Sequence, residues 1–275
     1  MSTNENKGKK TEVTALQAIS AEDRKDWISL AFVQAGICVC VPAFLLGALL
    51  AEAMPIWPAI ISGSLGYLIV VVGMVATGMI GCDLGLASCT CCQAGFGKSG
   101  ARFIVSTIFA VNMIGWFGIQ NGVCGEAFSN AMLAMTGWDI PVSNTIWGII
   151  MLLTAVYGVH ALEKLDKISI PLLMIIMCYG TFLAFKVYGT GNLNDEGTVQ
   201  SMSFMSGVAL SFNFTAVGTI TGPDYTRFQK SRKDTVKSVF YGVFPMGVIT
   251  LIMGIVLTKL SGQYDISMVL IEVGL

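Results

Sequence analysis

Long runs of apolar residues separated by short polar segments dominate this chain. A helix needs about 20 apolar residues to cross the hydrocarbon core of a bilayer. Seven runs are close to or above this length: Trp27–Leu50, Pro58–Ile80, Phe103–Met135, Val142–Val159, Ile168–Val187, Met202–Ile220 and Val236–Leu260. The pattern predicts an all-α membrane protein with seven transmembrane helices. The third run is longer than a span requires, so we expect its helix to be strongly tilted or to extend beyond the bilayer.

Composition agrees with this class of protein. Hydrophobic residues make up 54% of the chain, charged residues 12%, and the mean hydropathy is +0.73, whereas soluble domains carry about 25% charged residues. The net charge of −1 and the absence of a basic stripe argue against nucleic-acid binding. The polar segment 1–26 has no cleavage site after it, so it predicts a retained tail before a transmembrane domain at 27–275.

Basic residues predict the orientation. With the N-terminus inside, 14 of the 16 Lys and Arg residues fall in inner segments, and only Lys186 and Lys259 fall outside. Cytoplasmic loops carry an excess of these residues. The distribution predicts a multi-pass protein of the cell inner (plasma) membrane with a cytoplasmic N-terminus.

The first apolar run contains a proline at about mid-membrane. Pro42 removes a backbone donor and clashes with the preceding turn, so the carbonyls near Cys38 and Val41 would lose helical partners. Freed carbonyls of a broken helix coordinate Na⁺ in many transporters. The alternative is a simple kink whose carbonyls are satisfied by neighbouring groups.

The sixth run carries a second candidate interruption, at Gly218, Gly222 and Pro223. Broken helices in corresponding positions, five helices apart, are typical of inverted-repeat transporters and mark their binding sites. An ordinary span with a Gly-Pro exit turn would explain the same residues.

The third run holds an indole and a carboxamide on one helix face. Trp116 and Gln120 are four residues apart, so their side chains lie one above the other. An indole can stack on a flat ring, and a carboxamide offers one donor group and one acceptor to its edge. The pair predicts binding of a planar heterocycle.

Other polar residues have weaker interpretations. Glu126 is an acid within the third span, which suggests a role in coupling, although an outer-leaflet carboxylate that reaches water would look the same. The cysteines at 82, 89, 91 and 92 lack the paired spacing of zinc sites, so we expect free thiols and no metal. No enzyme constellation or organic-cofactor motif is present.

Three motifs, AGICVCVP at 35–42, GWFGIQ at 115–120 and TGPDYTRF at 221–228, together resemble the nucleobase–cation symporter-1 family of cytosine, purine, allantoin and hydantoin permeases. The resemblance implies twelve helices, ten of them in two inverted five-helix repeats with broken first and sixth helices. The final apolar run stops at Leu275, so we expect a C-terminally truncated chain holding the first seven helices.

The resemblance also implies a site. A base would lie between Trp116 and Phe214 and would hydrogen-bond to Gln120. The cytosine branch carries a glutamine where this chain has Met113, which is a departure. Its small hydroxyl residues on the sixth helix correspond here to Asn213 and Ala216, of which Asn213 is expected to bind substrate.

In the same family the coupling cation takes backbone carbonyls from the first helix, which match Cys38 and Val41, and hydroxyls from an eighth helix outside this chain. The sequence therefore predicts a secondary transporter, most similar to cytosine permeases, that imports a nucleobase or related heterocycle with Na⁺ or H⁺. Two alternatives stay open: an amino-acid symporter of the same architecture, and a seven-helix receptor.

Overall fold

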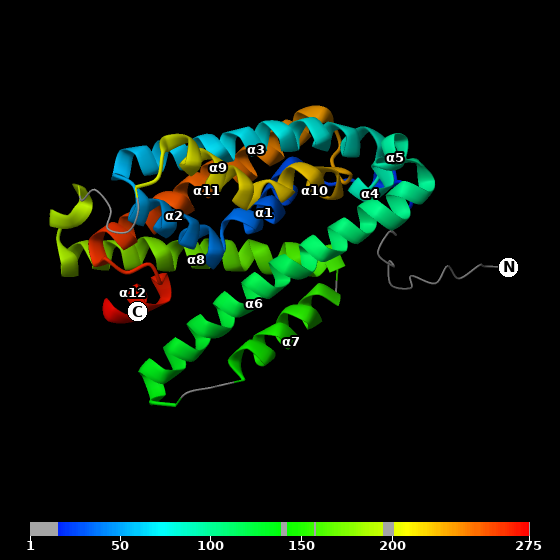
Figure 1. Cartoon of the computed structure of the whole chain (residues 1–275). Coiled ribbons are helices and arrows are strands. Elements are labelled where there is room, and N and C mark those ends of the chain that lie inside the picture. The colour runs from blue at the N-terminus through cyan, green and yellow to red at the C-terminus, as the bar shows by residue number, and fades with distance from the viewer. Residues whose placement is uncertain (1–15, 139–141, 157, 195–200, 275) are drawn as a thin grey trace.

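The computed structural model describes residues 16–138, 142–156, 158–194 and 201–274, and their regular elements are helices (Figure 1). The α-helices follow in this order: α1 (Trp27–Cys38), α2 (Val41–Ala53), α3 (Ile56–Leu84), α4 (Ser88–Cys91), α5 (Gln93–Gly100), α6 (Ser106–Thr136), α7 (Ser143–Val156), α8 (Gly158–Tyr188), α9 (Phe204–Thr215), α10 (Val217–Thr226), α11 (Arg232–Ser261) and α12 (Ile266–Glu272). A π-helical turn at Ala101–Val105 joins α5 to α6, and short 3-10 turns stand at Ala21–Asp23 and Gly191–Asn194.

The chain is an all-α membrane protein. Five helical stretches of the described residues are long and apolar enough to cross a bilayer, and α1 with α2 makes a sixth if the pair is one bent span. These six match six of the seven predicted spans. The fourth predicted span is shorter than expected: α7 has 14 residues, and α8 begins at Gly158, ten residues before the predicted start of the fifth span.

The predicted break in the first span is confirmed. Helices α1 and α2 meet at an angle of 50° across Val39 and Cys40. Pro42 lies in the first turn of α2, where a missing N–H costs nothing because that turn has no partner for it. The same proline cannot continue α1, so α1 ends before it.

The sixth span is interrupted more mildly. Helix α9 stops at Thr215 and α10 starts at Val217, but Ala216 between them keeps right-handed helical angles. Together they form one candidate span of 23 residues. The interruption thus lies before the Gly and Pro positions that the sequence singled out, and Pro223 is inside α10.

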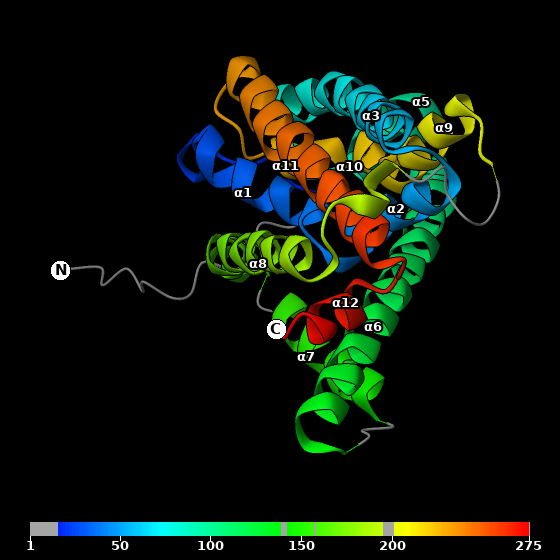
Figure 2. The same ribbon diagram turned by 90° about the vertical axis from the view of Figure 1, so that its left-hand side faces the viewer.

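The core lies between α2, α3, α9–α10 and α11, which run side by side (Figures 1 and 2). Glycines bring two of these helices into backbone contact. A Cβ added to Gly254 of α11 would stand 2.1 Å from the carbonyl oxygen of Phe44, and one added to Gly47 of α2 would stand 2.4 Å from that of Leu251. Small residues at such crossings permit the close packing that stabilises membrane helices.

Side-chain hydroxyls connect α3 to α9–α10. The Ser211 hydroxyl donates to the carbonyl oxygen of Gly63 at 2.7 Å. The Thr77 hydroxyl donates to the carbonyl oxygen of Thr219 at 2.6 Å. The Thr226 hydroxyl donates to the carbonyl oxygen of Gly78 at 2.7 Å. Hydrogen bonds between membrane helices contribute about 0.6–2 kcal/mol each. These contacts hold α3 and α9–α10 together as one unit.

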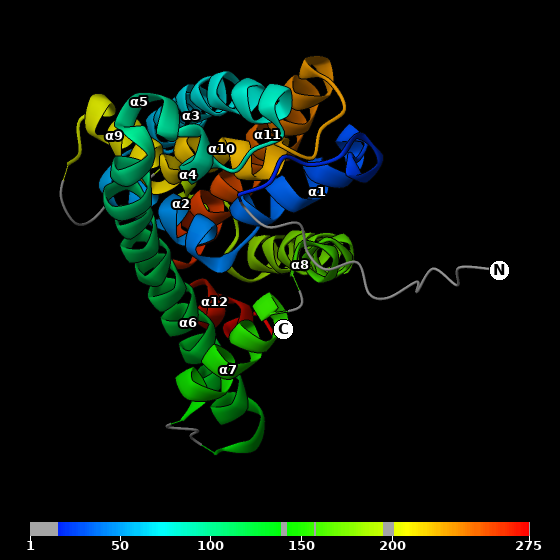
Figure 3. The ribbon, with the colours of Figure 1, turned by 90° about the vertical axis from the view of Figure 1, so that its right-hand side faces the viewer.

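Helix α6 departs from this core. With α5 and the π turn it forms a helical run of 44 residues. Only 6% of the residues in its most apolar 18-residue stretch are buried. It crosses the other helices obliquely and pairs with α7 (Figures 1 and 3). The long third span predicted from the sequence is therefore present, and much of its surface is exposed.

Candidate substrate-binding site

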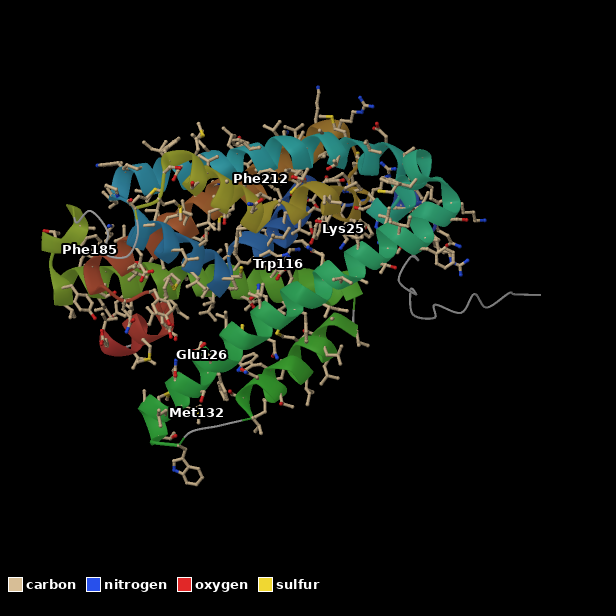
Figure 4. The ribbon with its side chains drawn as sticks, in the orientation of Figure 1. Lys25, Trp116, Glu126, Met132, Phe185 and Phe212 are labelled. Atoms are coloured by element: carbon tan, nitrogen blue, oxygen red, sulfur yellow. The ribbon has the colours of Figure 1, made fainter. Side chains whose placement is uncertain are left out.

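A cavity of about 220 Å³ lies where the break in the first span faces α6 and the α9–α10 junction. Three groups of residues line it, from the first span, α6 and the sixth span: Ile37 and Cys40; Met113, Trp116, Phe117 and Gln120; and Phe214, Thr215, Val217, Gly218, Thr221 and Tyr225. The structure thus brings together three predicted site residues, Trp116, Gln120 and Phe214. Figure 4 places Trp116 where α6 passes α1 and α2.

The two predicted stacking residues touch each other. The ring centroids of Trp116 and Phe214 are 5.2 Å apart, and the rings meet edge to face at 86°. A planar ring sandwiched between parallel aromatic rings requires about 7 Å between them, because each contact takes about 3.5 Å. The rings must therefore turn and separate before a base can lie between them.

Gln120 makes its contact with the break in the first span. Its side chain lies next to the thiol of Cys40, which donates to the carbonyl oxygen of Ile37 at 3.5 Å. Cys40 is half-buried and lines the cavity. Cys40 was not among the residues predicted from the sequence, although its position two residues before Pro42 could have pointed to it.

Asn213 lies apart from the other predicted substrate residues. It lines a neighbouring cavity of about 210 Å³ with Asn112, Ala216 and the other side of Trp116, and it is exposed. Successive residues on a helix point about 100° apart, so Phe214 and Asn213 face different cavities. Met113, Trp116 and Val217 line both cavities.

The backbone carbonyls predicted to bind a cation lie on either side of the break. Cys38 is fully buried and ends α1, and the residue four positions later is Pro42, which has no N–H to donate. The Cys38 carbonyl therefore lacks the partner that a continuous helix would supply. Val41 is the first residue of α2.

Glu126 lies almost two turns beyond Gln120 on α6 (Figure 4) and does not line the 220 Å³ cavity. Its side chain is exposed and lines a separate cavity of about 80 Å³, with Val41, Tyr264 and Asp265 among the other lining residues. A coupling role for Glu126 stays a prediction. Among the described residues, no three His, Cys, Asp or Glu side chains are grouped so that they could hold a metal ion.

The family model for permeases of cytosine and purines, uracil, thiamine and allantoin matches residues 19–273. The chain belongs to this family. Members of this family are permeases, that is, membrane transporters rather than enzymes. Among curated permeases, the cytosine permease of Escherichia coli K12 is 28% identical over 92% of this chain and 59% of its own length. The purine-uracil permease of Arabidopsis thaliana is 25% identical over 79% of this chain and 41% of its own length.

Solved structures show the same fold. The chain superposes with a TM-score of 0.84 on the nucleobase-cation-symport-1 transporter Mhp1 in a closed conformation with bromovinylhydantoin bound, at 18% identity and over 95% of this chain. The inward-facing conformation of Mhp1 gives a TM-score of 0.78 at 17% identity. In both comparisons the chain spans 61% of the solved protein. The chain thus spans about three fifths of the Escherichia coli permease and of Mhp1, and about two fifths of the Arabidopsis permease.

Proposed function

We propose that this permease imports a nucleobase, cytosine or a purine, or a related planar heterocycle. The observation that carries the proposal is the 220 Å³ cavity between the broken first span, Trp116 and Phe214. Its lining combines aromatic rings with the polar side chains of Gln120 and Thr221 and contains no charged residue. Such a lining suits an uncharged flat ring that stacks and forms hydrogen bonds at its edge.

Transport is coupled to Na⁺ or H⁺. The carbonyls of Cys38 and Val41 flank the break, next to the cavity-lining Cys40, so a cation held there would fix the part of the first span that contacts the base. A ligand shifts a conformational equilibrium only by its differential affinity for the two states. Cation and base therefore support each other's binding if both favour the conformation in which the break and α6 enclose the cavity.

A competition experiment tests the substrate class. The protein is expressed in cells that lack their own nucleobase permeases. Uptake of radiolabelled cytosine is then challenged with unlabelled purines, hydantoins and amino acids. We expect at least one planar heterocycle to compete and amino acids not to compete. Competition by amino acids alone would favour the amino-acid symporter, and absence of uptake of every labelled heterocycle would contradict the proposal.

The protein lies in the plasma membrane with its N-terminus in the cytoplasm. This part of the proposal rests on the 14 basic residues of the predicted inner segments. Modification by a membrane-impermeant lysine reagent in intact cells tests it. We expect Lys186, which has the outer position, to react and Lys98 to be protected; the opposite pattern would reverse the orientation.

A further inference from the structure

The polar side chains around the 220 Å³ cavity differ in whether they still have a proton to donate. The Cys40 thiol donates to the carbonyl oxygen of Ile37 at 3.5 Å. The hydroxyls of Thr215 and Thr221 donate to carbonyl oxygens one turn earlier in their own helices, at 3.1 and 3.0 Å. Each of these groups carries a single proton. In this arrangement they offer a substrate acceptors and no donor.

Three other side chains of the lining keep an N–H or O–H that is not donated to a protein group among the described residues: Trp116, Gln120 and Tyr225. An indole that stacks on a base holds its N–H in its own ring plane, so this proton does not point at the edge of the base. Asp224 and Asp166 interact with Tyr225 electrostatically, but neither accepts a hydrogen bond from it. The donors left for the edge of a base are therefore those of Gln120 and Tyr225.

Tyr225 belongs to the face of α10 that lines the cavity. Gly218, Thr221 and Tyr225 follow one another at intervals of three and four residues within this helix, so they share a face, and all three line the cavity. The ring of Tyr225 packs against the buried core cluster of the protein, which includes Met74. This packing holds the ring in place, so its hydroxyl is positioned before a ligand arrives.

Gln120 and Tyr225 approach the cavity from opposite ends. In Figure 1, α6 runs from right to left, whereas α9 and α10 run from left to right. Gln120 comes one turn after Trp116 on α6, and Tyr225 comes well after Phe214 on α10, while the rings of Trp116 and Phe214 touch each other. Side chains lean towards the N-terminus of their helix, so Gln120 and Tyr225 lean towards each other. A flat ring held at Trp116 and Phe214 therefore has these two donors on opposite edges.

We propose that the Tyr225 hydroxyl determines substrate selectivity by donating a hydrogen bond to a ring carbonyl of the heterocycle, at the edge opposite Gln120. The inference rests on the proposed function and names the feature of the base that the cavity selects. A buried donor whose ligand offers no acceptor is costly, and sites built to form such a bond discriminate against analogues that lack the group. Heterocycles with a ring carbonyl, such as cytosine, uracil and hypoxanthine, thus bind more tightly than the same rings without one.

Calorimetric titration of the purified protein with matched pairs of ligands tests the proposal without a transport assay. The pairs are cytosine with 4-aminopyrimidine and hypoxanthine with purine, and the second compound of each pair lacks the carbonyl. The net contribution of one hydrogen bond corresponds to about a fivefold difference in affinity. We expect the wild type to bind the carbonyl compound of at least one pair about fivefold more tightly. Tyr225→Phe, which removes the hydroxyl and keeps the ring, should bind both compounds about equally.

Two control variants assign the effect to Tyr225. Tyr241→Phe removes the hydroxyl of an exposed tyrosine of α11 that does not line the cavity, and it should keep the wild-type affinity ratio. Gln120→Ala should weaken both compounds of a pair alike and so keep that ratio as well.

A wild-type ratio in Tyr225→Phe would overturn the proposal, and so would loss of the ratio in Gln120→Ala. A wild type that shows no preference for the carbonyl compound in either pair would also overturn it, whatever the stability of the variants. Binding of heterocycles without any dependence on Tyr225 leaves the proposed function intact. Absence of binding of every heterocycle would contradict both proposals.

Discussion

Replacing Phe214 by alanine tests how the cavity accepts a planar ring. The edge-to-face contact between Trp116 and Phe214 at 5.2 Å contributes about 0.5–1.5 kcal/mol, and a base that enters between the rings must break it. Stacking of a base on an aromatic side chain contributes about 1–3 kcal/mol. The Phe214→Ala variant loses one stacking contact but no longer has the ring pair to separate. The two effects oppose each other and leave a net loss of about 1 kcal/mol, or about fivefold in affinity.

The assay is the concentration dependence of labelled cytosine uptake at saturating cation, or of the best competitor if that is another heterocycle. We expect Phe214→Ala to raise the half-saturating concentration about fivefold, and Phe214→Trp to stay near the wild type. Phe212→Ala is the matched control, because Phe212 is a half-buried neighbour that does not line the cavity (Figure 4). Unchanged or tighter binding by Phe214→Ala would refute the proposal that the base stacks between Trp116 and Phe214.

Two further predictions concern stability. Gly254→Ala should lower the melting temperature of the purified protein by several degrees, since its methyl group would stand 2.1 Å from the Phe44 carbonyl oxygen and overpacking costs about 1–3 kcal/mol; Gly95→Ala, with nothing within 4 Å, should not lower it, and equal effects would contradict the close approach of α2 and α11. Thr226→Val removes the buried hydroxyl 2.7 Å from the Gly78 carbonyl and should destabilise by about 1 kcal/mol in the same melting assay, whereas an unchanged melting temperature would show that this contact does not hold α3 to α10.

Proline chemistry and apolar run length were sufficient to predict the break in the first span and most of the spans. Pro42 cannot continue α1 and fits the first turn of α2, a constraint that is local to the sequence. The interruption at Ala216 was missed, because no residue there is unusual. The start of α8 was also missed, because its first turns are polar.

The site was only partly predictable for a similar reason. The i, i+4 spacing of Trp116 and Gln120 gives a shared face whatever surrounds the helix. Whether Asn213 points into the same cavity as Trp116 and Gln120 depends on the rotation of α9 relative to α6, which no local sequence pattern encodes.

Alkylation of Cys40 is the most direct test of a base cavity between the break and α6. Cys40 lines that cavity and its thiol contacts Gln120, so a bound base should shield it from a small maleimide. Mass spectrometry of the labelled protein can follow Cys40, with Cys89 of α4, which does not line the cavity, as the internal control. The proposed site predicts that a competing heterocycle slows labelling of Cys40 and leaves that of Cys89 unchanged. Equal labelling of Cys40 with and without a transported base would contradict it.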